Sequence, residues 1–197
     1  MIEERLTATV SPRYDAGTIT LHWLTALLVV TNFALAQIWR FLPNHSPQQA
    51  SLEHLHISLG VVLAAVLVVR ITWRLTHRHR FVDTAGRLAG LAARTAHFLL
   101  YGLLAAMVLT GLGKRWIPGR PAVLFGLPIP SPFAFDPAWR PYANTIHHYA
   151  AWTVVILAGL HAIAALFHHY GRRDGVLERM LPGPRRKPFV AVHNQQL

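Results

Sequence analysis

The chain has 197 residues, a formal net charge of +11 and no cysteine, and 53% of its residues are hydrophobic whereas only 14% are charged. This apolar excess is unlike that of a soluble domain and indicates a single membrane domain over residues 1–197. The lack of cysteine excludes disulfides, iron–sulfur clusters, thiolate-ligated haem and c-type haem attachment by this chain. The basic residues lie at the boundaries of apolar segments, which favours anionic lipid over nucleic acid as a partner.

Four apolar segments are predicted to cross a bilayer as helices, because each approaches the roughly 20 residues that a span needs. In chain order we expect helices at approximately 19–41, 52–75, 91–113 and 145–170. No small-residue cleavage motif follows the first segment, so we expect it to be retained. The predicted fold class is all-α, an integral membrane four-helix bundle.

The connection at 114–144 is the only long one between these segments. It contains seven of the thirteen prolines, so it cannot form one continuous helix. Its apolar centre at 122–135 is too short to span the bilayer. We expect this connection to be a periplasmic loop that lies on the outer membrane face or caps the bundle.

The positions of Lys and Arg predict the orientation of the bundle. Thirteen lie before the first helix, in the second connection or after the last helix, whereas five lie in the first and third connections. Because basic residues accumulate on the cytoplasmic side, both termini are expected to be cytoplasmic.

Several histidines lie inside the apolar helices, and four of them lie at two matching depths. His22 is near the cytoplasmic start of the first helix and His56 is near the outer start of the second. In the last helix, His147 and His161 are fourteen residues apart, which is about 21 Å along the axis and within roughly 40° of the same face. His56 can therefore oppose His147 on the outer side, and His22 can oppose His161 on the inner side.

Two facing imidazoles per site suit six-coordinate haem iron, which leaves no open position for oxygen chemistry and favours electron transfer. Zinc would need more ligands, and no carboxylate or thiolate lies in the apolar stretches of these helices, so a His-lined metal transporter is less favoured. For any single histidine, an interhelical hydrogen bond is the alternative interpretation. Gly60 and Gly159 would let a flat macrocycle approach the backbone, or would serve close helix packing.

Several motifs resemble the bacterial cytochrome b561 family, which overlaps with the membrane cytochrome b subunits of hydrogenases. The motifs are His22-Trp23-Leu24, Leu55-His56-Ile57-Ser58 with Gly60, Gly159-Leu160-His161-Ala162, Ala165-Leu166-Phe167-His168-His169-Tyr170, Leu124-Phe125-Gly126-Leu127, and Asp174-Gly175-Val176-Leu177 with Arg179-Met180. The resemblance implies two b haems in the bacterial inner membrane, with His22, His56, His147 and His161 as axial ligands of the iron. His148 competes with His147, but a ring turned by about 100° misses the shared face.

Members of this family are quinone-linked electron carriers, and one branch oxidises superoxide at the outer face and reduces ubiquinone. The short chain resembles that branch, so the expected activity is that of a superoxide:quinone oxidoreductase. The alternative is a cytochrome b subunit that carries electrons for, or anchors, a partner dehydrogenase or hydrogenase.

Other residues have weaker predicted roles. Basic residues at the outer mouth are candidates for steering superoxide, or are ordinary interfacial anchors: Lys114, Arg115, Arg120 and Arg140. Three histidines near the cytoplasmic helix ends are candidates for supplying protons to quinone, or for binding haem propionates or headgroups: His97, His168 and His169. Arg70 and Arg74 are candidate partners of haem propionates. The remaining histidines are expected to be solvated: His45, His54, His77, His79 and His193.

Overall fold

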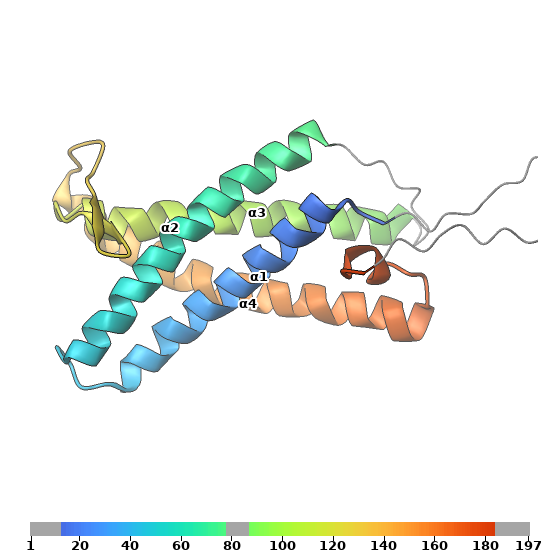
Figure 1. The fold of residues 1–197 in the computed structure, drawn as a ribbon, viewed down its shortest axis with the longest axis horizontal. Coiled ribbons are helices and arrows are strands. Elements are labelled where there is room, and N and C mark those ends of the chain that lie inside the picture. Colours follow the sequence, from blue (N-terminus) through green and yellow to red (C-terminus); the bar gives the residue numbers. More distant parts are fainter. Residues whose placement is uncertain (1–12, 78–86, 184–197) are drawn as a thin grey trace, which may run out of the picture.

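The computed structural model describes residues 13–77 and 87–183. Four long helices dominate it (Figure 1), namely α1 (Ala16–Ile38), α2 (Pro47–Thr76), α3 (Arg87–Trp116) and α4 (Arg140–Phe167). Segments long and apolar enough to cross a membrane contain α1, α2 and α4 entirely and α3 from Ala89 to its end. The prediction of an all-α membrane bundle is therefore confirmed.

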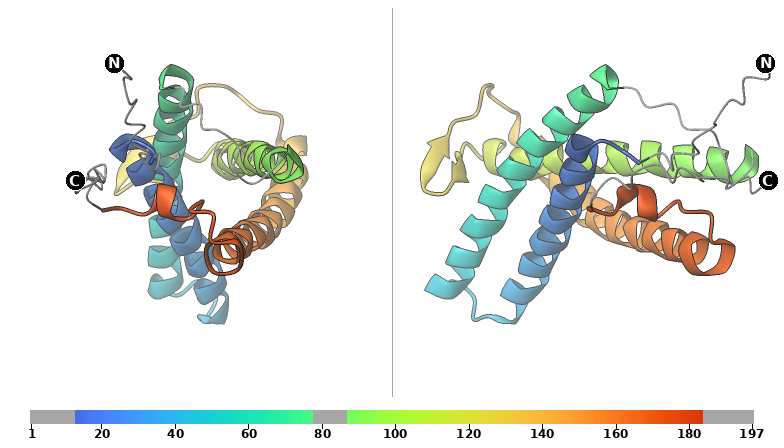
Figure 2. Two further views of the ribbon diagram at one scale, coloured as in Figure 1. Left: turned by 90° about the vertical axis from the view of Figure 1, so that its right-hand side faces the viewer. Right: turned by 45° about the vertical axis from the view of Figure 1, so that its right-hand side comes forward.

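The helices form two antiparallel pairs, because α1 packs along α2 and α3 packs along α4. Contacts between α2 and α3 join the two pairs, and Figure 2 shows the pairs crossing at an angle. The start of α1 and the segment after α4 lie at one end of the bundle, and the connections α1–α2 and α3–α4 lie at the other (Figure 1). This arrangement gives the bundle two chemically distinct ends.

The helices α2 and α4 both begin before the expected positions 52 and 145. In α2 the Ser46 side chain accepts a hydrogen bond from the backbone N–H of Gln49 at 3.2 Å, and Pro47 occupies the first turn. In α4 a proline also lies in the first turn. Both helices thus extend beyond the apolar runs from which their spans were predicted, and of the two only α2 has a side-chain N-cap.

A short hairpin lies within the long connection and was not predicted from the sequence. Strands β1 (Ala122–Leu124) and β2 (Leu127–Ile129) pair antiparallel, and the turn between them has φ angles of 47° at Phe125 and 92° at Gly126. The left-handed conformation explains the glycine in this tight turn. A 3-10 turn, η2 (Pro137–Trp139), then leads into α4.

Ser58 of α2 anchors this hairpin to the bundle. Its side chain is almost fully buried, at 2% exposure. The hydroxyl oxygen accepts from the backbone N–H of Phe125 at 2.9 Å, and it lies within donating distance of the carbonyls of Val123 (3.1 Å) and His54 (2.9 Å). The hairpin therefore caps the bundle at the end where His56 lies.

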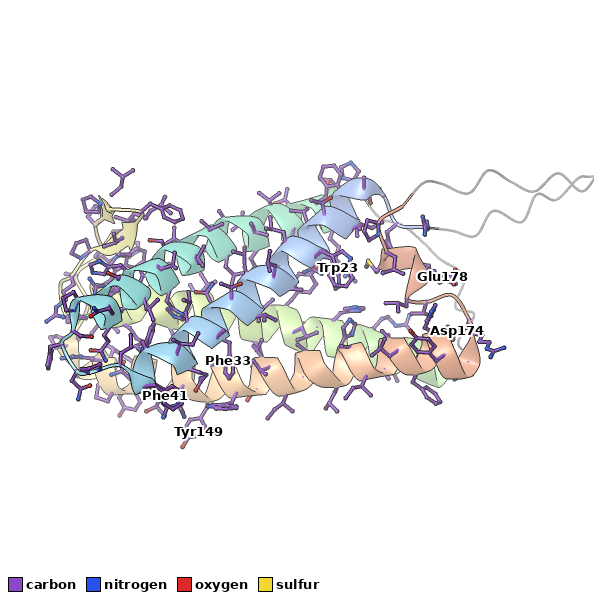
Figure 3. All side chains as sticks on the ribbon, turned by 60° about the horizontal axis from the view of Figure 1, so that its bottom comes forward. Trp23, Phe33, Phe41, Tyr149, Asp174 and Glu178 are labelled. Carbon is purple, nitrogen blue, oxygen red and sulfur yellow. The ribbon has the colours of Figure 1, made fainter. Side chains whose placement is uncertain are left out.

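A small apolar core separates the two ends of the bundle. Leu67, Leu104 and Val154 are buried against one another at the middle of α2, α3 and α4. Many other large apolar side chains are exposed, among them Tyr149 at 67% exposure, which points away from the bundle in Figure 3. This pattern is expected for a bundle whose outer surface contacts lipid and whose helices associate by packing.

After α4 the chain turns back across its own end of the bundle. A π-helical turn, η3 (His168–Arg172), is followed by a segment at 174–181, which contains η4 (Glu178–Met180) and which we call the C-terminal strap. The indole Nε1 of Trp23 donates to the carbonyl of Met180 at 2.7 Å, and Figure 3 shows the strap lying beside the start of α1. The strap thus covers the end of the bundle where His22 lies.

Candidate functional site

Two imidazoles face each other at the hairpin end of the bundle. The ring centroids of His56 (α2) and His147 (α4) are 6.3 Å apart, and we call these rings the outer pair. Nδ1 of His56 lies 3.0 Å from the carbonyl oxygen of Asn32 in α1. A carbonyl only accepts, so Nδ1 carries the proton and Nε2 keeps its lone pair. His56 is therefore oriented to bind a metal through Nε2.

The second ring of the outer pair is held in the same tautomer. Nδ1 of His147 lies 3.2 Å from Oγ1 of Thr110, and the ring also has a hydrogen bond to the backbone of Met107. The Thr110 hydroxyl donates to the Ala106 carbonyl at 2.6 Å, so it accepts from His147. A Cβ on Gly111 would lie 3.1 Å from Cε1 of His147, so glycine lets this ring lie against α3.

Open space adjoins the outer pair on two sides. A cavity of about 380 Å³ lies towards α1 and α4, and a second of about 150 Å³ lies towards α2 and α3. Both cavities are lined by His56, His147, Asn32, Trp39, Leu63, Met107 and Lys114. Gly60 lines the smaller one, where a Cβ would meet no atom within 4 Å. The outer pair therefore has room for a flat group on either side.

A second pair of imidazoles lies at the strap end of the bundle. The ring centroids of His22 (α1) and His161 (α4) are 6.4 Å apart, and we call these rings the inner pair. Nη2 of Arg70 lies 3.0 Å from Nδ1 of His22. A guanidinium only donates, so Nδ1 of His22 accepts and the proton of its neutral ring is on Nε2. This tautomer is the opposite of that in the outer pair.

Basic and aromatic side chains surround the inner pair. The guanidinium carbons of Arg70 and Arg74 lie 5.3 Å and 5.6 Å from the ring centroid of Tyr101, which are cation–π contacts. The ring of His97 from α3 lies 5.2 Å from that of His161. The sequence placed His97 only near the cytoplasmic end of a helix, whereas the structure places it within the inner site.

The spacing of both pairs fits a metal bound between the rings. Each ring centre lies about 1 Å behind its nitrogen and each nitrogen about 2 Å from a metal, so two opposed imidazoles need centres roughly 6 Å apart. Among the described residues, no three His, Asp or Glu side chains form a group that could hold a metal ion. Two neutral imidazoles per site therefore fit haem, whose macrocycle supplies the other four ligands.

The basic residues predicted for the outer mouth differ in their surroundings. Lys114 lines both cavities beside the outer pair. Arg115 lies 3.6 Å from the carboxylate of Glu53, and its Nε donates to the carbonyl of Pro121 at 3.2 Å, so its charge is balanced and it fixes the loop. Arg120 is exposed on that loop. Of these three, Lys114 is the one placed beside the histidines.

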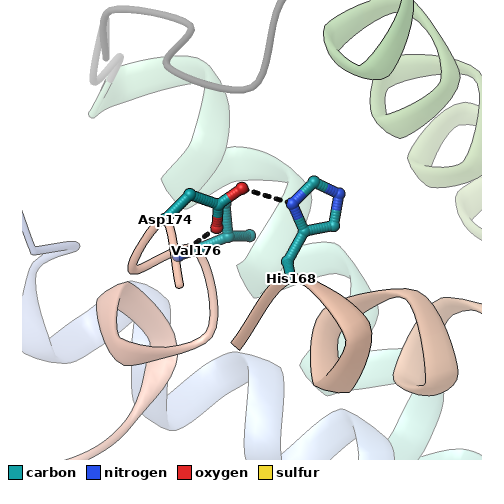
Figure 4. A network of polar contacts seen from close by, with 3 residues as sticks. All are labelled: His168, Asp174 and Val176. Atoms are coloured by element: carbon teal, nitrogen blue, oxygen red, sulfur yellow. Dashed lines mark hydrogen bonds and ion pairs between the residues drawn. The ribbon is translucent and has the colours of Figure 1, made fainter. Parts of the chain in front are cut away.

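The two histidines after α4 contact the C-terminal strap, a role that the sequence did not predict. Nδ1 of His168 lies 2.5 Å from Oδ2 of Asp174, whose other oxygen accepts from the N–H of Val176 at 3.3 Å (Figure 4). His169 lies 4.0 Å from Glu178. Partial burial opposes ionisation of Asp174, but these hydrogen bonds and nearby positive charge outweigh it and lower the pKa of the carboxyl.

The other histidines lie away from both pairs. His45, His54 and His77 are exposed, and His77 stacks on Trp73 with the ring centroids 3.9 Å apart. His148, the competitor of His147, is also exposed. His79 and His193 lie outside the described residues.

Four membrane-spanning helices with an imidazole pair near each end define a membrane cytochrome of the b type. The family model described as prokaryotic cytochrome b561 matches residues 13–183. The chain therefore belongs to the prokaryotic cytochrome b561 family, which confirms the resemblance seen in its motifs. Proteins of this family bind b-type haem and transfer electrons, and this chain is a multi-pass protein of the bacterial inner membrane.

Curated relatives support this assignment over most of their length. Cytochrome b561 homolog 2 of Escherichia coli K12 is 33% identical over 171 residues, which cover 86% of this chain and 91% of that protein. The probable superoxide oxidase CybB of Yersinia pestis is 27% identical, with 88% and 98% covered. Cytochrome b562 of Cereibacter sphaeroides is 28% identical, with the same two coverages. The chain is thus similar in size to the relatives it matches.

Proposed function

We propose that this protein binds two b-type haems, oxidises superoxide at the periplasmic face and reduces ubiquinone. One haem would lie between His56 and His147, and the other between His22 and His161. The observation that carries this proposal is the presence of two imidazole pairs, 6.3 Å and 6.4 Å apart, near opposite ends of the bundle. When bound, haem supplies one-electron chemistry at iron, and the protein binds, orients and tunes it.

The residues around the outer pair leave Nε2 of both rings available, and these nitrogens would hold the haem iron. The Asn32 carbonyl accepts a hydrogen bond from Nδ1 of His56, and the Thr110 hydroxyl and the Met107 backbone accept from His147. Such partners fix the ring orientation and raise the basicity of a ligating histidine. The outer pair is therefore preorganised for iron in the folded chain.

The residues around the inner pair suit a negatively charged cofactor. Arg70 donates to His22, and both Arg70 and Arg74 lie beside Tyr101. Guanidinium groups bind carboxylates with two parallel hydrogen bonds. Pairing of Arg70 with a haem propionate would release Nδ1 of His22 to carry a proton, and would leave Nε2 for the iron.

The reaction balances when two superoxide ions reduce one quinone. Two superoxide anions give two dioxygen molecules, and the quinone takes two electrons and two protons to form the quinol. Similarity to the probable superoxide oxidase of Yersinia pestis supports this substrate. Lys114 lines the cavities beside the outer pair, where its charge would attract the anion and raise the encounter rate.

The positive-inside rule supports the proposed orientation, with both termini in the cytoplasm and the hairpin in the periplasm. His56 and His147 would then lie on the side from which superoxide arrives. Protons for quinone would come through titratable groups at the other end, where His97, His168 and His169 remain candidates. Reaction of single cysteines at 122–135 only with a cytoplasmic thiol reagent would refute this orientation.

The purified protein provides the decisive experiment. A reduced-minus-oxidised spectrum should show a b-type α band, and haem extraction should give two haems per chain. Rapid mixing with superoxide should reduce the haem, and continued turnover should require ubiquinone. The rate should fall as ionic strength rises and in Lys114→Gln. Haem that only a partner dehydrogenase reduces would instead support the subunit alternative, and absence of the α band would reject both.

A further inference from the structure

One ring of the inner pair lacks the hydrogen bond that the other site histidines have. His22, His56 and His147 each have a partner at Nδ1. Among the described residues, His161 has a hydrogen bond at neither ring nitrogen and contacts other imidazoles instead. A histidine that ligates a metal almost always donates its second N–H to an acceptor. His161 therefore needs an acceptor that the inner site must supply.

His97 provides a matching lone pair. Its ring has a hydrogen bond to the backbone of Ala93, one turn earlier in α3. Because the acceptor there is a carbonyl, one ring nitrogen of His97 is the donor and the other nitrogen of the neutral ring keeps a lone pair. The ring lies edge-on to His161, with an interplanar angle of 64°.

The spacing argues against His97 as an iron ligand itself. The centroids of His97 and His161 are 5.2 Å apart, which is shorter than the 6.4 Å and 6.3 Å within the two opposed pairs. Rings this close do not leave the space that a metal between them needs. Since no three such side chains form a metal-binding group in the described part of the chain, His97 is a neighbour of the ligand set.

We infer that His97 accepts a hydrogen bond from Nδ1 of His161 and thereby positions the inner haem ligand. The inference rests on the proposed haem between His22 and His161. A nitrogen acceptor would fix the plane of the His161 ring and increase its electron donation to iron. The outer pair uses oxygen acceptors for the same purpose. At each site, hydrogen-bond acceptors would then orient histidines that hold the iron.

The test compares variants of the full-length protein with its haems bound. His97→Leu removes the acceptor, His97→Gln keeps one at similar reach, and His54→Leu changes an exposed histidine elsewhere. The readouts are haem content, the electron paramagnetic resonance signal of each ferric haem, and the two midpoint potentials. His97→Leu should shift the inner signal and raise the inner potential, and His97→Gln should restore both. In all variants the outer haem should keep its wild-type signal and potential. His54→Leu should match the wild type in every readout.

Two results would overturn the inference. One is a wild-type inner signal and potential in His97→Leu. The other is loss of the inner haem in His97→Leu together with its retention in His22→Ala, which would make His97 a ligand. If His97→Leu loses the inner haem, a wild-type signal in His97→Gln supports the hydrogen bond, and loss in both variants refutes it. A wild-type protein without two haems would refute the proposed function instead.

Discussion

The outer and inner imidazole pairs have almost the same spacing but very different surroundings. The outer pair is held by oxygen atoms of the helices, namely the Asn32 carbonyl, the Thr110 hydroxyl and the Met107 backbone. In the inner pair, the long charged side chain of Arg70 donates to His22, and a third imidazole, that of His97, contacts His161. The outer site is thus set by the fold itself, whereas the inner site depends on groups that a bound anion would rearrange.

The charges around the two pairs also differ. Two guanidinium groups, Arg70 and Arg74, lie by the inner pair, against one ammonium group, Lys114, by the outer pair. The outer site also contains Oδ1 of Asn32, a buried oxygen without a hydrogen bond among the described residues. Positive charge stabilises the reduced form of the iron, whereas the negative end of a dipole, such as Oδ1 of Asn32, destabilises it. We therefore expect the inner site to have the higher midpoint potential, which favours electron flow inwards.

Removal of one proposed outer ligand should have the largest effect on the difference between the two sites. His56→Ala should lower the haem content from two per chain to one, because a single imidazole cannot hold six-coordinate iron. The remaining haem should keep the inner resonance signal. His54→Ala, a change at an exposed histidine on the same helix, should retain both haems. Retention of two haems in His56→Ala would disprove the pairing of His56 with His147.

Replacement of Arg70 should change the midpoint potential of the inner haem much more than that of the outer haem. Arg70→Gln removes a positive charge beside His22, so the inner midpoint potential should fall, on the order of 60 mV for a tenfold change in the one-electron equilibrium. A redox titration followed at the α band measures both potentials. The outer potential should move much less because the two sites are about 21 Å apart along α4, and the effect of a charge falls with distance. Equal shifts at both haems would contradict this view of the inner site.

The sequence predicted the four helices and both histidine pairs because each depends on a regular spacing. Apolar runs reveal spans, and the fourteen-residue interval from His147 to His161 places two rings on one helix face. The structure brings His147 to His56 and His161 to His22, as that interval suggests. Their role as haem ligands remains a proposal.

Features that depend on contacts between distant segments were not predicted. The link from Ser58 to the hairpin and the pairing of Arg115 with Glu53 join residues far apart in the chain, and neither leaves a periodic pattern. His97 was predicted to lie near the correct end, but its contact with His161 depends on how α3 packs on α4. Depth is readable from a sequence, whereas the rotation of one helix against another is not.

A smaller effect is expected from Gly111, which lies behind the outer ring. Gly111→Ala would place a Cβ 3.1 Å from Cε1 of His147 and should turn that ring, shifting the resonance signal of the outer haem alone. Gly102→Ala is the matched control, since its Cβ would meet nothing within 4 Å. Replacing glycine by alanine in a helix interior stabilises the helix by about 1 kcal/mol where the methyl group meets no other atom. Gly102→Ala should therefore gain thermal stability with both signals unchanged.

If Gly111→Ala leaves the resonance signal of the outer haem unchanged, the His147 ring can move away from the added methyl group without changing how it holds the haem. In that case the close contact with α3 would not orient the ring, and its hydrogen bonds to Thr110 and the Met107 backbone would have to do so alone.

The smallest expected effect concerns the C-terminal strap at the inner end. Its carboxylate, Asp174, has a lowered pKa relative to the ordinary value of 3.8. A group with a lowered pKa in the folded state contributes stability that is present above the ordinary value and is lost as pH falls through the folded one. Asp174→Asn should therefore lower the thermal unfolding temperature slightly at pH 7, and the difference from the wild type should vanish as the pH falls below 3.8.

Circular dichroism melts between pH 7 and the acid limit test this dependence, with Glu178→Gln as the comparison. Glu178 lies 4.0 Å from His169 and is half-exposed, so solvent screening should make its contribution smaller still. An Asp174→Asn deficit that persists unchanged at acid pH would show that the side chain acts through shape and not through its charge. The contact of His168 with the strap would then be a neutral hydrogen bond, and the inner end of the bundle would be closed without help from ionisation.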